Sequence, residues 1–269
     1  MDKIIFSENF EEFFAAWGLE SFDDFYNYSA GQIINENTKR NVRVLTFPVG
    51  DKSRTFYMKR FHEPHLKDML FALRNFGKLY SQAACEWHNA KTLLNNGIRT
   101  YLPVCCGLRT TLGIERKSFL ITSELQSICM TDFVKQNWST LPAPQKEKII
   151  ISLARTIRKI HDAGISLPDL YIWHIFIDEK KDPDGNSRYE FAVIDLHRMK
   201  NNVSNTREYI KNLARLDHSM LDEYFDENSR KLLLESYAGD NWPGDITTLA
   251  KKVKKHSNKI SARRNQKPY

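Results

Sequence analysis

Three side chains that could do chemistry, Asp169, His174 and Asp195, flank a segment whose pattern predicts a β-hairpin. Residues 175–177 and 189–194 are rich in apolar and aromatic side chains, and a turn-rich stretch with an Asp-Gly pair separates them. Antiparallel pairing brings the start of the first strand and the end of the second to the same open end. We therefore expect the three side chains to be neighbours.

Carboxylates gathered at the end of a sheet suit phosphoryl transfer. One can hold a divalent cation through oxygen, and another can orient or deprotonate a hydroxyl nucleophile. His174 is ambiguous, because Mg²⁺ prefers oxygen to imidazole ligands. It either assists the metal site or braces the loop through a hydrogen bond.

The same reaction needs a cation on the phosphates, and Lys59 with Glu86 is a candidate pair. Lys59 lies in 54–61, where alternating aromatic and polar residues predict a strand. Glu86 falls on the apolar face of a helix predicted over 81–97, where an unpaired buried carboxylate would be costly. Either residue alone would usually be a solvated surface residue, so the order of these pieces along the chain carries the prediction.

The elements that must position these residues divide the chain into a β-rich first part and a mainly helical second part. A polar connector is predicted to run to about residue 145, followed by a helix over 145–162 with an apolar stripe. Further strands are predicted over 31–47 (two, around a polar turn), near 101–106 and over 118–123. The predicted divisions are an N-lobe over 1–124, a C-lobe over 125–250 and a basic tail over 251–269.

Composition excludes several classes of protein. The chain has 269 residues, 41% hydrophobic and 27% charged, which is typical of folded globular proteins and not of collagen or disordered chains. No stretch approaches the ~18 apolar residues of a membrane-spanning helix, and the acidic N-terminal segment does not resemble a signal peptide. We expect a soluble cytoplasmic protein. The four cysteines lack the spacing of a disulfide framework or zinc site, so buried reduced thiols are expected.

The net charge of +7 is concentrated in residues 251–269, which carry eight Lys or Arg and no acidic residue. Such a run can bind nucleic acid or an anionic membrane, or remain solvated. About 1 kcal/mol per basic residue near an anionic leaflet would hold an enzyme at the inner-membrane surface. Nucleic-acid binding ranks last, because the rest of the chain is close to neutral and shows no nucleic-acid motif.

These pieces occur in a distinctive order and include the sequence segments YMKRF, CEWHNAKTLLNNGI, IHDAGISLPDLYIWHIFI and VIDLHRM. In both respects the chain resembles the lipopolysaccharide core kinase (Kdo/WaaP) family, a branch of the eukaryotic-like kinase fold. The resemblance covers about residues 55–216 and is strongest over 157–199. It implies an α+β, bilobal protein-kinase-like fold with a β-rich N-lobe and a short, mainly helical C-lobe. It also implies an ATP-dependent phosphotransferase acting on a sugar hydroxyl (heptose or Kdo) of the lipopolysaccharide inner core. Mg²⁺ or Mn²⁺ would be the metal, and the core glycolipid at the cytoplasmic face of the inner membrane the partner.

The resemblance assigns nucleotide-binding roles in the first part of the chain. Lys59 resembles the phosphate-binding lysine and Glu86 its helix partner. The hinge that would bond the adenine ring is expected at Ser123, Glu124 and Leu125.

In the second part, Asp169 resembles the catalytic-loop aspartate that orients or deprotonates the acceptor hydroxyl. Asp195 resembles the metal-binding aspartate, and His174 stands where most kinases have a metal-binding asparagine. His161 is expected to be structural.

Two features depart from the kinase pattern. Leu167-Pro168 replaces the usual His-Arg before the catalytic aspartate, and no glycine-rich phosphate loop is present. These departures motivate an alternative, a catalytically silent kinase-like binding module.

The stretch after Asp195 is short and lacks an Ala-Pro-Glu signature, which favours a small acceptor. A helix predicted there would place Arg207 and Lys211 at the mouth of the site or, alternatively, on a solvated face.

Overall fold

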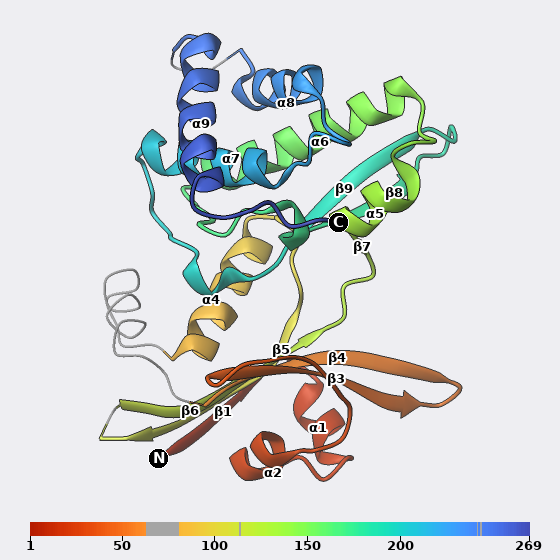
Figure 1. The fold of residues 1–269 in the computed structure, drawn as a ribbon. Helices are drawn as coiled ribbons and strands as arrows, with labels where there is room; N and C mark the ends of the chain where they lie inside the picture. Colours follow the sequence, from red (N-terminus) through yellow and green to blue (C-terminus); the bar gives the residue numbers. More distant parts are fainter. Residues whose placement is uncertain (63–80, 113, 241, 243) are drawn as a thin grey trace. The chain divides into compact units, whose positions relative to one another are not determined.

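The computed structural model describes residues 1–62, 81–112, 114–240, 242 and 244–269. The chain folds as two compact units (Figure 1). The first unit comprises Met1–Asn95 with Thr100–Leu125, and the second comprises Asn96–Arg99 with Gln126–Tyr269.

The first unit is built on an antiparallel sheet, which has six strands within the described residues in the order β1-β5-β6-β4-β3-β2. The predicted strands over 31–47, 54–61, 101–106 and 118–123 are confirmed, most of them longer than predicted. The strand bounds are β1 Asp2–Phe6, β2 Gln32–Glu36, β3 Arg40–Val49, β4 Lys52–Phe61, β5 Pro103–Thr111 and β6 Ile114–Ser123.

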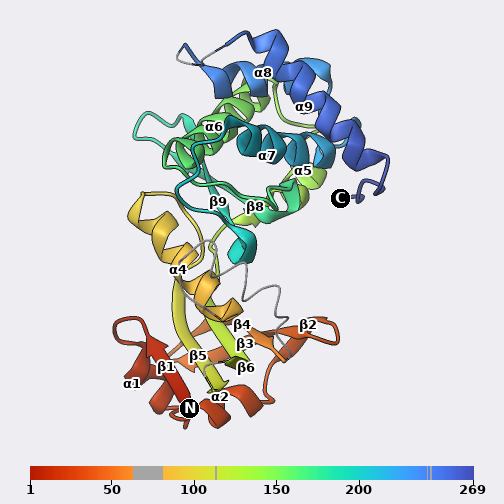
Figure 2. The same ribbon diagram turned by 90° about the vertical axis from the view of Figure 1, so that its left-hand side faces the viewer.

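Helices cover both faces of this sheet (Figures 1 and 2). Helices α1 (Phe10–Ala15) and α2 (Phe22–Asn27) pack on one face, and α4 (Gln82–Asn95) packs on the other. The core under α1 and α2 is largely aromatic, with the Phe14 and Phe25 rings 5.4 Å apart in a T-shaped arrangement. Neither short helix was predicted from the sequence, whereas α4 was.

Strand β4 distributes its side chains between these two faces. Phe56 and Met58 are buried in the aromatic core, whereas Lys59 points to the opposite face, toward α4. This alternation follows from the two-residue period of a strand. It is what places a lysine opposite a helix in the middle of the sheet.

The second unit combines a small antiparallel sheet with helices. Within the described residues the sheet has three strands in the order β7-β8-β9. The predicted hairpin is confirmed and is longer than predicted, as β8 and β9. The bounds are β7 Ile128–Cys129, α5 Met130–Asn137, α6 Ala143–Asp162, β8 Ile175–Lys181, β9 Ser187–Val193, α7 Thr206–Ser219, α8 Glu227–Ala238 and α9 Ile246–Ser261.

Helix α6 confirms the helix predicted over 145–162. The apolar stripe of α6 is buried throughout, at Ile149, Ile150, Leu153, Ile157 and Ile160.

The connector predicted to run to residue 145 is wrong in part, because it contains β7 and α5. Helix α5 buries Met130, Phe133 and Val134. Three apolar residues within a polar stretch were too few to show a helical period.

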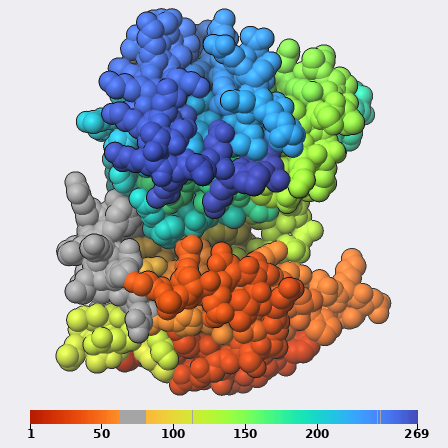
Figure 3. Space-filling view, in the orientation of Figure 1, coloured from red at the N-terminus to blue at the C-terminus, as the bar shows by residue number. Residues whose placement is uncertain are grey.

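The basic segment 251–269 is not a separate tail. Residues 251–261 lie in α9, whose Leu249 and Val253 are buried as the helix packs along α7 (Figure 2). The last residues are also docked, because the Tyr269 hydroxyl donates to the Ser219 carbonyl at 2.6 Å and Gln266 Nε2 donates to the His218 carbonyl at 2.7 Å. In the space-filling view these residues, in dark blue, cover part of one face of the second unit (Figure 3).

The cysteines follow the prediction of reduced thiols. Cys105, Cys106 and Cys129 form no disulfide bond, and Cys85, Cys105 and Cys106 are buried. Burial raises the pKa of Cys105 and Cys106, which keeps these thiols protonated. Among the described residues, no helix has both the length and the apolar character that crossing a membrane requires.

Candidate functional site

The first unit brings Lys59 and Glu86 together, as predicted. Lys59 Nζ donates to both Glu86 carboxylate oxygens, at 2.8 and 2.9 Å. The Glu86 side chain is 1% exposed and that of Lys59 is 19% exposed. Tyr101, which the sequence did not single out, also donates through its hydroxyl to Glu86 Oε2 at 3.2 Å. The carboxylate is therefore held from two sides, and it fixes the lysine at the centre of the sheet.

The predicted hinge lies at the end of β6, and two of its three backbone donors are already engaged. The Ser123 N–H donates to the Leu102 carbonyl at 2.9 Å, and the Glu124 N–H donates to the Thr55 carbonyl at 3.1 Å. The Leu125 N–H donates to no described residue.

The second unit gathers Asp169, His174 and Asp195 around one small cavity, as the antiparallel pairing predicted. Asp169 lies in the loop before β8, His174 ends a short 3₁₀ turn (Ile172–His174), and Asp195 follows β9. The Ile194 N–H donates to the His174 carbonyl at 2.9 Å, which ties the two sides of the hairpin together at this end.

Of the two roles that the sequence left open for His174, the structure contains the loop brace. His174 Nδ1 is 2.8 Å from the Asp169 carbonyl oxygen, which can only accept, so Nδ1 carries the proton and the ring braces the loop. In the neutral ring Nε2 then presents a lone pair, and it lies 3.7 Å from Asp195 Oδ2. Metal-binding histidines commonly donate their other N–H to a carbonyl in this way, so the brace is compatible with a ligand role.

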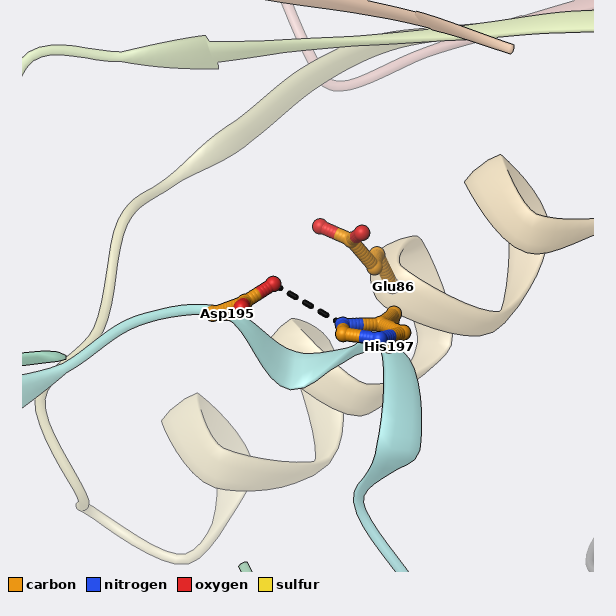
Figure 4. Close-up of side chains that lie close together, drawn as sticks. All are labelled: Glu86, Asp195 and His197. Atoms are coloured by element: carbon orange, nitrogen blue, oxygen red, sulfur yellow. Dashed lines mark hydrogen bonds and ion pairs between the residues drawn. The ribbon is translucent and has the colours of Figure 1, made fainter. Parts of the chain in front are cut away.

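Asp195 adopts a left-handed backbone conformation, with φ 60° and ψ 61°. Such conformations are uncommon outside glycine, asparagine and aspartate and tend to cluster at functional sites. The 3₁₀ turn that follows (Leu196–Arg198) returns the His197 ring to the carboxylate, with Nδ1 2.9 Å from Asp195 Oδ1 (Figure 4). His197 was not predicted as a site residue, although its place two residues after Asp195 was a local signal.

The two oxygens of Asp169 have different surroundings. Arg198 Nη1 donates to Oδ1 at 3.1 Å. Oδ2 is buried and accepts no hydrogen bond from any described side chain or backbone group. A buried carboxylate oxygen without a donor is costly unless another molecule supplies one, so Oδ2 is positioned to accept a proton or a hydroxyl hydrogen bond.

The loop that carries Asp169 is anchored without a His-Arg pair. Asn212 Oδ1, on α7, accepts from the Leu167 N–H at 2.8 Å and the Ser166 hydroxyl at 3.1 Å, and lies 3.2 Å from His161 Nε2. Burial lowers the pKa of His161 to about 3, so its ring is neutral and donates to Asn212. His161 is therefore structural, as expected, and Asn212 is an anchoring residue that sequence reasoning missed.

The donor sets fit the expected metal and nucleotide. A hard divalent cation prefers carboxylate oxygens, and Asp195 lines the same cavity as His174, the other predicted metal ligand. In the first unit, the ammonium group of Lys59 is held rigidly and suits an anionic phosphate.

Of the two basic residues expected at the mouth of the site, Lys211 lines a second cavity, which also has Asp169 on its wall. Arg207 is exposed and does not line this cavity.

Comparisons with known proteins agree on one family. The model of the lipopolysaccharide kinase (Kdo/WaaP) family matches residues 25–237. Two relatives, each named lipopolysaccharide core heptose(I) kinase WaaP, are 28% identical to the chain. The relative from Pseudomonas aeruginosa aligns over 155 residues, 56% of this chain and 58% of its own length. The relative from Escherichia coli aligns over 170 residues, 62% of each chain.

A solved structure described as WaaP in complex with acyl carrier protein superposes with a TM-score of 0.69. It covers 96% of this chain and 99% of that chain at 22% identity, and it confirms the α+β, kinase-like fold predicted from the sequence.

Proposed function

The chain belongs to the lipopolysaccharide kinase (Kdo/WaaP) family, and from that premise we propose that it transfers the γ-phosphoryl group of ATP to a sugar hydroxyl of the lipopolysaccharide inner core. The observation that carries the proposal is the cavity lined by Asp169, His174 and Asp195, in which Asp169 Oδ2 lacks a hydrogen-bond donor. Heptose is the favoured acceptor over Kdo, because the matched relatives are named heptose(I) kinases.

In this proposal Asp169 orients the acceptor hydroxyl and takes its proton through Oδ2. The Arg198 guanidinium stays on Oδ1, so it holds the carboxylate in place while leaving the second oxygen available. Phosphoryl transfer of this kind depends mainly on positioning and charge neutralisation, and the anchored loop supplies the positioning.

Asp195, with His174 as a neighbouring donor, would hold the Mg²⁺ or Mn²⁺ ion of the metal-nucleotide complex. The bound ion would neutralise charge on the phosphates. His197 holds one Asp195 oxygen and thereby orients the carboxylate.

Lys59 would bind the nucleotide phosphates, and Glu86 would act through Lys59 by fixing its ammonium group. We assign adenine recognition to the hinge at Ser123, Glu124 and Leu125, with the Leu125 N–H as the donor.

We also propose that the protein associates peripherally with the cytoplasmic face of the inner membrane. Support comes from exposed lysines on α9, at Lys251, Lys252, Lys254 and Lys255. Sedimentation with anionic vesicles tests this, and Lys252→Gln/Lys255→Gln should lower the bound fraction because each basic residue near an anionic surface contributes about 1 kcal/mol. Equal partition of the two proteins would reject membrane binding through this face. Deleting 251–269 is unsuitable as a test, because it removes the docked Val253.

Mass spectrometry of core oligosaccharide from cells with and without the gene tests the reaction. The proposal expects one phosphate to be missing without the gene and restored by the unsubstituted protein. Asp169→Asn and Asp195→Asn should not restore it, whereas Asp184→Asn, in the exposed β8–β9 turn, should. An unchanged oligosaccharide would reject the proposed acceptor.

The alternative of a catalytically silent binding module rested on Leu167-Pro168 and on the missing glycine-rich phosphate loop. The Asn212 anchor shows how the loop that carries Asp169 is held without His-Arg, so the first departure no longer favours the alternative. Thermal stabilisation by ATP and Mg²⁺, with no turnover on any core acceptor, would nevertheless establish it.

A further inference from the structure

A second cavity of about 340 Å³ lies beside Asp169 and is strongly basic. The catalytic loop, helix α7 and the C-terminal part of α9 form its walls. Asp169 is the one acidic residue among the described residues that line it. The cations that line it are Arg198, Lys211, Arg215, Lys259, Arg263 and Arg264.

Most of this positive charge is not neutralised within the protein. Over the described ranges, Arg215, Lys259, Arg263 and Arg264 form no ion pair with a carboxylate, and Arg215 Nη1 instead donates to a backbone carbonyl at 3.1 Å. Lys211 shares the carboxylate of Glu208 with a second lysine. The cavity thus holds an excess of cations whose hydrogen-bond donors can serve a ligand.

The crowding of cations is also apparent at His256, on the same wall. Burial, followed by the nearby charges of Lys259, Lys211 and two further cations, lowers the pKa of His256. A concave site lined by one sign of charge concentrates ions of the opposite sign.

Packing anchors the backbone that carries the cations of α9 and of the turn after it. The buried side chains of α9 (Leu249, Val253 and Ser257) dock it along α7, and His218 Nδ1 is 2.9 Å from the Ser261 hydroxyl. The Lys259 and Arg263 side chains therefore come from an anchored helix end and the turn that follows it. The aromatic wall is held as well, because the Tyr171 ring stacks on Trp173 with centroids 4.6 Å apart.

We propose that this cavity is the acceptor subsite and that it binds anionic substituents, carboxylate or phosphate, near the sugar hydroxyl delivered to Asp169. This inference rests on the proposed function. Arginine forms paired hydrogen bonds with both carboxylate and phosphate, which makes several arginines beside one catalytic carboxylate suited to a multiply anionic sugar. The nucleotide phosphates are assigned to Lys59 and the metal ion instead. Asp169 lines both this basic cavity and the small cavity that also has His174 and Asp195 on its wall.

The test compares Lys259→Gln/Arg263→Gln with a matched control, Lys148→Gln/Arg155→Gln. The control removes the same two charges from exposed positions on α6, outside the cavity. The assay is steady-state phosphate transfer to lipid-free core oligosaccharide, with three acceptors: native, carboxyl-reduced and dephosphorylated. Thermal denaturation of each variant checks that it is folded.

The expected result is a rise of about tenfold or more in KM for the native acceptor in the cavity variant, because the loss of even one charged hydrogen bond costs roughly a factor of ten. KM for ATP should not change, and the control should behave as the unsubstituted protein. The unsubstituted protein should show the same rise in KM for one of the two modified acceptors. The anion that this acceptor lacks, carboxylate or phosphate, is the one that the cavity recognises.

Three results would overturn the subsite. One is an equal rise in KM for both double variants. Another is an unchanged KM on the soluble acceptor with reduced binding to anionic vesicles, which would make the cavity a membrane contact. The last is equal KM for all three acceptors. If the unsubstituted protein phosphorylates no core acceptor, the proposed function fails instead. Calorimetric titration with the native oligosaccharide then tests the acceptor subsite. The subsite is supported if the cavity variant binds the oligosaccharide at least tenfold more weakly than the control variant, and it is rejected if the two variants bind equally.

Discussion

Asn212→Ala should destabilise the second unit while leaving its surface unchanged. Asn212 is fully buried, and its Oδ1 is the acceptor for Leu167 N–H, His161 Nε2 and the Ser166 hydroxyl. Alanine removes that acceptor and leaves two donors that cannot turn away, the Leu167 amide and the His161 ring. The Ser166 hydroxyl can rotate.

The size of the effect follows from these groups. A buried donor left without an acceptor costs about 1–3 kcal/mol, so the two fixed donors together cost about 4 kcal/mol. Asn212 Nδ2 is itself buried and donates a hydrogen bond to no described group. Removing it therefore recovers about 1 kcal/mol of the free energy of unfolding. The net loss is about 3 kcal/mol of the free energy of unfolding, which lowers Tm by about 6–12 °C for a unit of this size.

Differential scanning calorimetry of the full chain measures this shift. Asn258→Ala, an exposed asparagine on α9, serves as the control and should change stability by no more than about 0.5 kcal/mol. A Tm within about 2 °C of the unsubstituted protein for Asn212→Ala would refute the proposed anchoring of the catalytic loop.

Further predictions concern the catalytic groups and acid stability. Lys59→Ala should lower kcat/KM for ATP by at least about a hundredfold, and Glu86→Gln by less because it acts through Lys59; equal losses would contradict that order. His197→Ala should weaken metal-nucleotide binding about tenfold, measured by titration, because Asp195 loses its orienting partner; unchanged affinity would exclude this role. Hydrogen bonds from two lysines lower the pKa of Glu208 to about 2, so its stabilisation is present above an unfolded-state pKa near 4.5 and is lost as pH falls toward 2. The Tm difference between Glu208→Gln and the unsubstituted protein should accordingly shrink below about pH 4, and a constant difference would contradict the assignment.

The sequence predicted the elements whose period or order was distinctive. The Lys59–Glu86 pair could be predicted because a carboxylate on an apolar helix face requires a partner, and a strand lysine was the one that phosphoryl transfer would use. The Asp169 and Asp195 neighbourhood followed from antiparallel pairing of the hairpin. In both cases a general physical rule linked residues far apart in the chain.

Other features depended on packing that no local pattern shows. Asn212 lies 45 residues from Leu167, and an asparagine on a predicted helix gives no indication of which backbone group it will meet. Helices α1, α2 and α5 have six, six and eight residues, too short for a helical period to stand out. In α9 the exposed lysines dominated the composition, so the apolar positions that dock the helix were overlooked.

At Leu167-Pro168 the chain departs from the kinase pattern, and different residues anchor the Asp169 loop and supply the cation that pairs with Asp169. The Leu167 side chain is buried and its N–H is bound by Asn212, so the loop is fixed through backbone and side-chain packing in the core. The cation comes from elsewhere: Arg198, three residues after Asp195, pairs with Asp169 Oδ1. Because Arg198 also lines the basic cavity, the same guanidinium touches the proposed catalytic carboxylate and the proposed acceptor subsite. An anionic acceptor in this cavity would contact the guanidinium that holds Asp169 Oδ1, which would couple acceptor binding to the position of the catalytic carboxylate.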